Sequence, residues 1–359
     1  MPFYRCSKCK KIWQYPIEKC PDCFLTLERI GSEKIKVVGV SKVQIPTLFH
    51  PKTPYFVLLL EDENGNKWVQ KSVKEYKIGD EFEIKIKNDE NAVSIWRIKY
   101  DIFEGIEKVI AILGGLEVNS ETKILILPTL ISPKHPYFAE NTSPEFLQAT
   151  IQYLIEIGVR QENIKVVAQS FDEVPIGASA QKSQLLKVCQ EKKVLPVDLA
   201  EKKFVKKEGL EISEEVFSSN LIINLPILKI GKISASENIL KLLKKENYLG
   251  LEYLYSASES GGGKEGSPSL TGEEILENLK EILPAPLTIA EGINIQKSNG
   301  YTTFLGLILA SFNSLNLDRV FTEITMIKEL PECLKSVKIE NIPVLGRQIE
   351  ELQYEVEKF

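Results

Sequence analysis

The stretch YRCSKCKKIWQYPIEKCPDC, residues 4–23, contains two Cys-x-x-Cys pairs separated by ten residues. Their thiolates, from Cys6, Cys9, Cys20 and Cys23, can occupy the corners of a tetrahedron, as zinc requires in closed structural sites. A hairpin of this size cannot bury a core, so metal ligation would supply most of its folding free energy. The spacing therefore predicts a zinc ribbon over residues 1–30, with zinc as the cofactor and sulfur at all four coordination positions.

The same four thiols bear on two further questions: which metal binds and what balances its charge. Rubredoxin-like iron binds the same ligand set and would make the ribbon a redox centre, so iron is the alternative to zinc. Residues 1–25 carry five lysines and arginines against Glu18 and Asp22. A zinc ion with four thiolates has a formal charge of about −2, so we expect these basic residues to balance the metal site and not to contact nucleic acid.

The composition indicates several domains in a reducing, aqueous compartment. A chain of 359 residues exceeds the size at which one hydrophobic core keeps growing, and 43% apolar content is enough for two or three cores. The net charge of −5 gives no global reason to bind nucleic acid or a membrane, so we expect neither partner. The N-terminus lacks a secretory signal, and the longest uncharged apolar run, residues 304–312, is too short to span a bilayer. Cys189 and Cys333 are isolated thiols, which fits a cytoplasmic protein.

A β-rich zone follows the ribbon, from Ile35 to Tyr100. Several of its segments alternate apolar with polar residues, and turn signals at Asn64-Gly65 and Gly79-Asp80 separate them. The segments are KIKVVGV (34–40), PYFVLLLEDE (54–63), NKWVQKSV (66–73), EFEIKIK (81–87) and VSIWRIK (93–99). Such a series of short strands predicts a small all-β OB-fold barrel over residues 31–102, with an unspecific small sheet as the alternative.

The rest of the chain, residues 103–359, alternates apolar runs with helical stretches, which predicts an α/β domain with a largely parallel sheet. Its clearest helix begins at Ser143-Pro144, with a capping serine and a proline in the first turn, and ends at Gly158. The predicted strands are KILIL (123–127), IKVVAQS (164–170), VLPVDL (194–199), LIINLPIL (221–228), LTIAEGI (287–293) and TTFLGLILASF (302–312).

The first hundred residues resemble the domain-of-unknown-function 35 family, in which a rubredoxin-like zinc ribbon precedes an OB-fold. The segments that carry the resemblance are YRCSKC (4–9), CPDC (20–23), the strand after Gly31, TPYFVLLLEDENG (53–65) and YKIGDEFEIK (76–85). The resemblance implies an accessory subunit that binds acyl-coenzyme A or bridges thiolase-type enzymes. Aromatic residues suited to such a ligand fit core packing equally well: Phe49, Tyr55, Phe56 and Trp68.

Residues 120–330 resemble the domain-of-unknown-function 362 family, an α/β family without a settled general activity. The resemblance lies in KILILPTLISP (123–133), LIINLPILKIGK (221–232), ENYLG (246–250), IAEGI (289–293) and GLILASFNSLNLD (306–318). Several polar positions of the family's pattern are replaced, for example at Thr129, Gly231, Glu291 and Asn313, whereas Lys229 and Asp318 remain. This implies a remodelled site that binds a ligand or partner without the ancestral chemistry.

A ligand site can also be predicted from the strands alone, because open parallel sheets bind ligands outside the carboxyl ends of their strands. Polar residues that follow the predicted strands are the candidates for this pocket: Thr129, Ser132, His135, Asp172, Lys229, Lys232, Glu291 and Asn294. If chemistry occurs there, Lys229 and Glu291 are the cation and base that we would test. The two histidines, His50 and His135, each lie beside a proline and support neither a Ser-His-Asp triad nor a histidine metal site.

Two functions compete on these observations. The first is a zinc-binding accessory or scaffolding protein that contacts an acyl-CoA or a thiolase-type partner and carries a remodelled ligand-binding domain. The second is an enzyme of unknown reaction that uses the strand-end pocket around Lys229 and Glu291. The tail RQIEELQYEVEKF (347–359) places Ile349, Leu352, Val356 and Phe359 on one helical face, which either docks on its own domain or contacts a second copy in a homo-oligomer.

Overall fold

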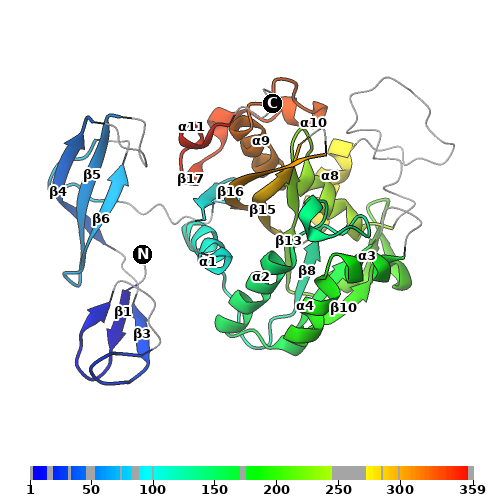
Figure 1. Ribbon diagram of the computed structural model, residues 1–359, viewed down its shortest axis with the longest axis horizontal. Helices are drawn as coiled ribbons and strands as arrows, with labels where there is room; N and C mark the ends of the chain where they lie inside the picture. The colour runs from blue at the N-terminus through cyan, green and yellow to red at the C-terminus, as the bar shows by residue number, and fades with distance from the viewer. Residues whose placement is uncertain are drawn as a thin grey trace. The chain divides into compact units, whose positions relative to one another are not determined.

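The computed structural model describes residues 3–13, 19–30, 34–45, 53–72, 75–82, 89–98, 101–169, 175–244, 272–283, 286–297 and 300–354. The chain divides into two compact units, Met1–Lys85 and Ile86–Phe359 (Figure 1). The first unit holds two small antiparallel sheets, whereas the second holds one large sheet and a short hairpin.

The cysteine-rich segment of the first unit forms a three-stranded antiparallel sheet. Its strands are β1 (Phe3–Cys6), β2 (Ile12–Trp13) and β3 (Leu27–Ile30), and β1 lies in the middle. Cys6 ends the central strand, and Cys20 is also fully buried. Few other side chains of this segment are buried, as expected of a sheet too small for a hydrophobic core.

The second sheet of this unit consists of β4 (Ile35–Val43), β5 (Tyr55–Asp62) and β6 (Lys67–Ser72), in that order. One face forms a small core that includes Phe56 and Trp68. Core packing therefore accounts for Phe56 and Trp68. Tyr55 is buried outside that core, with Lys71 Nζ 4.9 Å from the centroid of its ring, and Phe49 lies outside the described residues.

The predicted OB-fold barrel is not shown: the described residues form no closed barrel. The sheet stops at three strands, and Glu81 of the expected fourth strand makes only an isolated bridge to Lys36; residues 83–88 lie outside the description. The expected fifth strand, β7 (Val93–Arg97), belongs to the large sheet, where it pairs with two other strands. Its first three residues are all buried, which suits a strand covered on both faces and not a half-exposed barrel strand.

The large sheet contains nine described strands and is mostly parallel, as predicted. Along it lie β10 (Leu195–Asp198), β9 (Ile164–Ala168), β8 (Ile124–Pro128), β13 (Leu221–Leu225), β15 (Leu287–Gln296), β16 (Thr302–Ser311), β7 and β17 (Val344–Gly346). Only β16 runs antiparallel to its neighbours. Pro226 divides the predicted 221–228 strand, so that β14 (Ile227–Lys229) pairs separately with β15.

Helices cover both faces of this sheet (Figure 1). On β8, Ile124 and Ile126 pack under α1 (Ile102–Ile112), α2 (Pro144–Glu156) and α4 (Leu185–Lys192). Leu125 and Leu127 face the opposite core, which includes α8 (Gly272–Ile282) and residues that follow α6 (Ser234–Ile239). Burial on both faces explains why the strands read as continuous apolar runs. The remaining helices are α3 (Ile176–Lys182), α5 (Glu214–Phe217), α9 (Ser314–Ile324), α10 (Glu332–Lys335) and α11 (Ile349–Leu352), and a hairpin joins β11 (Phe204–Lys207) to β12 (Leu210–Ser213).

The signals at both ends of the predicted helix are confirmed. Ser143 caps α2 by accepting a hydrogen bond from the N–H of Phe146, and Gly158 follows the helix with a φ of 103°. In the C-terminal tail, α11 packs Ile349 against the domain core, so the docking interpretation holds for this residue. Val356 and Phe359 lie outside the described residues.

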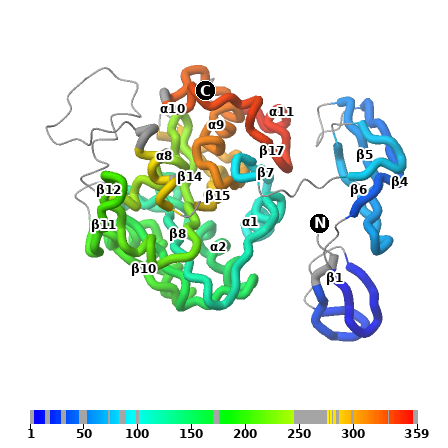
Figure 2. The backbone as a smooth tube through the Cα atoms, turned by 180° about the vertical axis from the view of Figure 1, so that it is seen from behind, coloured from blue at the N-terminus to red at the C-terminus, as the bar shows by residue number. Residues whose placement is uncertain are grey.

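Strands from distant parts of the chain meet at one edge of the large sheet. The strand β17 pairs in parallel with β7, although more than 240 residues of sequence separate them (Figure 2).

Among the described residues, no helix is both long enough and apolar enough to cross a bilayer.

Candidate functional site

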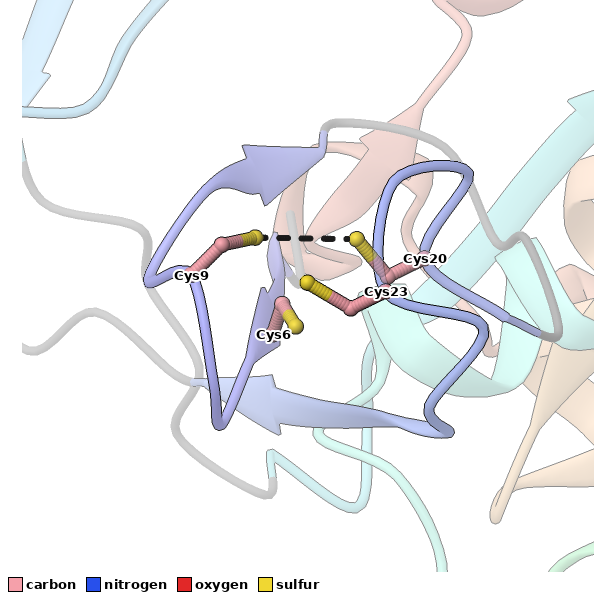
Figure 3. Close-up of side chains that lie close together, drawn as sticks. All are labelled: Cys6, Cys9, Cys20 and Cys23. Atoms are coloured by element: carbon pink, nitrogen blue, oxygen red, sulfur yellow. Dashed lines mark hydrogen bonds between the residues drawn. The ribbon is translucent and has the colours of Figure 1, made fainter.

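The four predicted cysteines converge on one point of the first unit. Their sulfur atoms all lie within 4.8 Å of one another, all four thiols are free, and the Sγ atoms of Cys9 and Cys20 are 3.6 Å apart (Figure 3). A metal bound to four sulfurs at about 2.3 Å has sulfur–sulfur edges of about 3.8 Å, so the cluster has the size of a tetrahedral thiolate site. The four cysteines could therefore hold one metal ion.

The two Cys-x-x-Cys pairs share the same backbone geometry. In the first, the N–H of Lys10 donates to the carbonyl of Cys6, and in the second the N–H of Phe24 donates to the carbonyl of Cys20. Lys10 and Phe24 are equivalent positions and both have left-handed backbones, with φ of 60° and 57°. Each turn aims its two thiols at the same point. Because neither position is a glycine, this conformation could not be predicted from the residue types.

The electrostatics of the cluster call for a cation. The backbone N–H of Cys9 hydrogen-bonds to Cys6 and lowers the pKa of that thiol to about 7. Burial, together with the neighbouring thiols of Cys9 and Cys6, raises the pKa of Cys23 to about 12. Four such close sulfurs cannot all ionise unless a positive ion joins them. Lys11 lies near Cys9 and Cys20 but pairs with Asp22, which offsets its charge, so its balancing role at the metal site stays a prediction.

The second candidate site lies at the carboxyl ends of the large sheet's strands, where the loop after β8 is tightly organised. Asn141 is buried, and its side-chain carbonyl accepts hydrogen bonds from the N–H of Ile131 at 2.8 Å and of Ser132 at 3.3 Å. The Ser132 hydroxyl donates to Glu140 at 2.7 Å, and Lys134 pairs with the same carboxylate. Asn141 therefore folds the loop back, and Glu140 meets residues that precede it by several positions.

Thr129, predicted as a ligand-binding residue, is buried, and its hydrogen bonds stabilise the fold. Its hydroxyl hydrogen-bonds to Asn238 Oδ1 at 3.2 Å and accepts from the N–H of Ile227 at 3.3 Å. Asn238 continues this network to Asn224 on β13. Thr129 therefore ties β8, β14 and α6 together below the strand ends.

The other predicted residues occupy different environments. His135 is exposed, and its Nδ1 accepts from the N–H of Tyr137 at 3.2 Å. Lys232 and Asn294 are exposed, whereas Asp172 lies outside the described residues. Asn313 caps α9 by accepting a hydrogen bond from the N–H of Asn316.

Glu291 is a buried carboxylate in the middle of β15. Its Oε2 accepts a hydrogen bond from the N–H of Ser143 at 2.8 Å, at the start of α2. Burial raises the pKa of Glu291 to about 7, although the contact with Ser143 lowers it in part. The side chain can therefore carry or release a proton near neutral pH.

Lys229 lies at the end of β14, opposite Gln296 of β15, and is half-buried. Burial lowers the pKa of Lys229, against the negative charges of Glu140 and Glu237, which raise it. Among the described residues, no hydrogen bond or ion pair joins Lys229 to Glu291. The predicted cation and base therefore face different partners.

Three residues near Lys229 were not predicted: Glu140, Glu237 and Lys241. Lys241 is buried to 2% exposure, and burial lowers its pKa to about 7 against the opposing charge of Glu237. A signal for this pair was available in SENILKLL (236–243), where Glu237 and Lys241 are one helical turn apart among apolar residues. Glu140 gave no such signal because the fold of its loop brings it to the site.

Comparisons with known proteins give partial matches. One solved structure, "Ltp2-ChsH2(DUF35) aldolase", is 21% identical, with 28% of this chain and 76% of that chain covered and a TM-score of 0.19. A crystal structure of a protein with unknown function from the DUF35 family of Sulfolobus solfataricus is 20% identical, with 22% and 62% covered and a TM-score of 0.17. Both TM-scores lie far below 0.5, so neither likeness carries anything further about this chain.

No curated protein matches the chain. A family model described as "Domain of unknown function (DUF362)" matches residues 124–237, which run from β8 into α6 and include Lys229 and Glu237. The predicted resemblance to that family is confirmed over this range, and the chain carries a DUF362 domain there.

Proposed function

We propose that this chain is a zinc-binding accessory or scaffolding protein whose first unit contacts an acyl-CoA ligand or a thiolase-type partner. The four-thiol cluster carries this proposal. Sulfur would fill all four positions around the metal, leaving no place for a catalytic water, so a bound zinc would have a structural role. Cys6, Cys9, Cys20 and Cys23 would hold the ion, and its charge would stabilise their thiolate forms.

Exposed apolar side chains beside the cysteine turns support a contact with a protein partner. Phe24 is 76% exposed, its neighbour in the chain, Leu25, is exposed, and so is Ile12 on β2. Exposed apolar side chains that adjoin one another, as Phe24 and Leu25 do in the chain, support an interaction surface. The resemblance of residues 4–87 to accessory subunits suggests a thiolase-type enzyme as the partner, and the free thiols suggest the cytoplasm.

The test combines metal analysis with co-purification from the native source. We expect one zinc per chain in a colourless preparation and a stoichiometric thiolase-type enzyme, identified by mass spectrometry. Phe24→Ser should lose the partner and keep its zinc, whereas Tyr301→Ser, which changes an equally exposed aromatic residue of the α/β domain, should retain both. A coloured iron-containing protein, or equal recovery of the partner with Phe24→Ser, would contradict the proposal.

For the α/β domain, we propose a remodelled ligand-binding module at the strand ends around Lys229. The observation in its favour is a half-buried lysine at the end of a strand of a mostly parallel sheet, beside Glu140 and Glu237. The second candidate is an enzyme at the same strand ends, with Lys229 as the cation and Glu291 as the base. Both groups have pKa values shifted toward neutrality.

Native mass spectrometry of the purified chain distinguishes these two proposed functions of the α/β domain. A small molecule retained by the wild type and lost in Lys229→Gln supports a ligand module. Conversion of that molecule to a product, with turnover abolished in Lys229→Gln, would replace the module with an enzyme.

A further inference from the structure

The two cysteines of each Cys-x-x-Cys pair differ in exposure. Cys6 and Cys20, the first of each pair, are fully buried, whereas Cys9 and Cys23 are half-buried. All four side chains nevertheless point toward one centre (Figure 3). A small molecule in solution therefore reaches the cluster by way of Cys9 or Cys23.

The surroundings of these two accessible thiols differ in charge. Cys9 lies between exposed lysines at positions 8 and 10, whereas Cys23 follows Asp22. Asp22 pairs with Lys11, so these two charges cancel and add no positive charge beside Cys23. Positive charge favours the reactive thiolate and stabilises hydroxide as it leaves a peroxide. Cys9 is therefore the thiol at which we expect an oxidant to react first.

A second thiol lies within reach of Cys9. The Sγ atoms of Cys9 and Cys20 are 3.6 Å apart, and no two of the four sulfurs are more than 4.8 Å apart. A disulfide requires a sulfur–sulfur distance of about 2 Å, so a small movement of the two side chains would join them. Redox-sensing cysteines are typically accessible thiolates beside a resolving cysteine, and the cluster offers both.

The two cysteines of the α/β domain have neither property. Cys189 is 2% exposed in the core under α4, and burial raises the pKa of its thiol to about 11. Cys333 is also buried, in a different small core with Leu334. A buried thiol with a raised pKa is inert toward oxidants. These two residues are therefore internal references for the reactivity of Cys9.

We infer that Cys9 is an oxidative modification site, at which a peroxide releases the metal and unfolds the small sheet. This inference rests on the proposed zinc-binding and partner-contacting role of the first unit and names its regulation. Two sulfurs cannot replace four around the ion, and the sheet has almost no hydrophobic core to hold it without metal. Because Phe24 and Leu25 belong to this segment, oxidation would also end the proposed partner contact.

The reaction takes place in two steps. The Cys9 thiolate attacks one oxygen of hydrogen peroxide, the O–O bond breaks, and hydroxide leaves a sulfenic acid on Cys9. The Cys20 thiolate then attacks the Cys9 sulfur, so that the S–S bond forms while the S–O bond breaks and a second hydroxide leaves. The two thiolates lose two electrons in total, and the peroxide gains them.

Titration of the full-length, zinc-loaded chain with hydrogen peroxide tests this inference, with a colorimetric chelator to follow zinc release. We expect the bound zinc to be released, and to be taken up again after dithiothreitol and zinc are added. Differential alkylation with mass spectrometry should find Cys9 oxidised first and then joined to Cys20. Cys189 and Cys333 should stay reduced.

A variant of one flanking lysine tests the role of charge. Lys8→Gln should slow peroxide-dependent release by about twofold, because one exposed positive charge beside Cys9 is lost. Lys202→Gln, at an exposed lysine of the α/β domain, should leave the rate unchanged. Zinc content before peroxide is added shows whether each variant has formed its metal site.

The outcomes separate this inference from the proposed function. Zinc that stays bound at peroxide concentrations that oxidise free cysteine would overturn the inference and leave the zinc-binding function standing. Oxidation of Cys23 before Cys9, or of Cys189 as fast as Cys9, would also overturn it. A purified chain that contains no zinc would overturn both.

Discussion

The cysteine-rich sheet and the α/β domain contain two different kinds of candidate site. In the first, four residues within 18 positions of sequence converge on a point that could hold one ion, and there is almost no hydrophobic core around them. In the second, residues from several loops meet above a sheet buried on both faces. Metal binding at the first site would stabilise the sheet around it, whereas the hydrophobic cores stabilise the α/β domain independently of the second site.

This difference explains what the loss of a group does in each region. Replacing one cysteine of the candidate metal site should unfold the small sheet and leave the folding of the α/β domain unchanged. A polar residue of the strand-end site should change stability modestly and act mainly through pH or ligand affinity. The following predictions test this contrast, beginning with the largest effect.

Replacing Cys20 with serine should abolish metal binding and unfold the small sheet. Structural zinc contributes about 10 kcal/mol or more to folding in domains of this size. Metal content by mass spectrometry and amide NMR signals of residues 3–30 measure the loss, and thermal unfolding of the α/β domain should not move. The control is Cys189→Ser, which changes a buried thiol of α4 and should keep one zinc per chain. A Cys20→Ser protein with one tightly bound zinc would contradict the prediction.

Replacing Glu291 with glutamine should change how stability depends on pH. The folded-state pKa of about 7 lies above the ordinary 4.5, so the folded protein binds the proton more tightly than the unfolded chain. Stability therefore falls as the pH rises from about 4.5 to 7, and the penalty is fully present above 7, at about 3 kcal/mol. The glutamine carbonyl can still accept from Ser143.

Denaturant unfolding at pH 5 and pH 8 measures this effect. Glu291→Gln should gain stability relative to the wild type between the two values, whereas Glu340→Gln, at an exposed glutamate, should follow the wild type. Other buried groups, such as Asp318 and Lys241, titrate in both proteins and cancel in the difference. If the difference in free energy of unfolding between Glu291→Gln and the wild type is the same at pH 5 and pH 8, Glu291 does not have the raised pKa described above.

Replacing Asn141 with alanine should loosen the loop that carries Ser132 and Glu140. Its carbonyl satisfies the N–H of Ile131, and its amide donates to the carbonyl of Ser132, so the loss costs about 2 kcal/mol. Hydrogen exchange at Ile131 should accelerate together with the fall in stability. Asn119→Ala breaks a similar but exposed turn and should cost less; equal costs would mean that burial of Asn141 adds nothing.

Replacing Lys10 with glycine should stabilise the metal-bound sheet by about 1 kcal/mol, because glycine adopts the left-handed backbone without strain. Release of zinc to a colorimetric chelator should slow by several-fold. Lys8→Gly, at a neighbouring exposed position, should instead speed release or leave it unchanged. Faster release from Lys10→Gly would mean that the two equivalent turns are not strained.

Much of the fold could be predicted because each signal was local. The apolar run of β8, the capping serine of α2 and the cysteine spacing each act within a few residues. The fate of β7 could not be predicted in this way. Its five residues read as a strand of any sheet, and its partner β16 begins more than 200 positions later.

The surroundings of the candidate residues at the strand ends could be predicted only in part, for the same reason. Lys229 follows a recognisable strand, and Glu291 lies within one, so both could be identified from the sequence. Their partners could not, because Glu140 reaches Lys229 only through the loop that Asn141 folds back, and Glu291 meets the start of α2. The sequence indicates which strand end a residue follows, but the folded loops decide which charges meet.

The pairing of β7 with β16 and β17 also fixes an order of events on the ribosome. The cysteine-rich sheet is complete once residue 30 has emerged, so it can take up its metal while most of the chain is still being made. By contrast, β7 must wait for β16, and the sheet edge closes only after Gly346 has left the exit tunnel. For most of synthesis, the newborn chain should therefore be a metal-loaded sheet followed by an α/β domain without its closing strands, a form that chaperones would be expected to recognise.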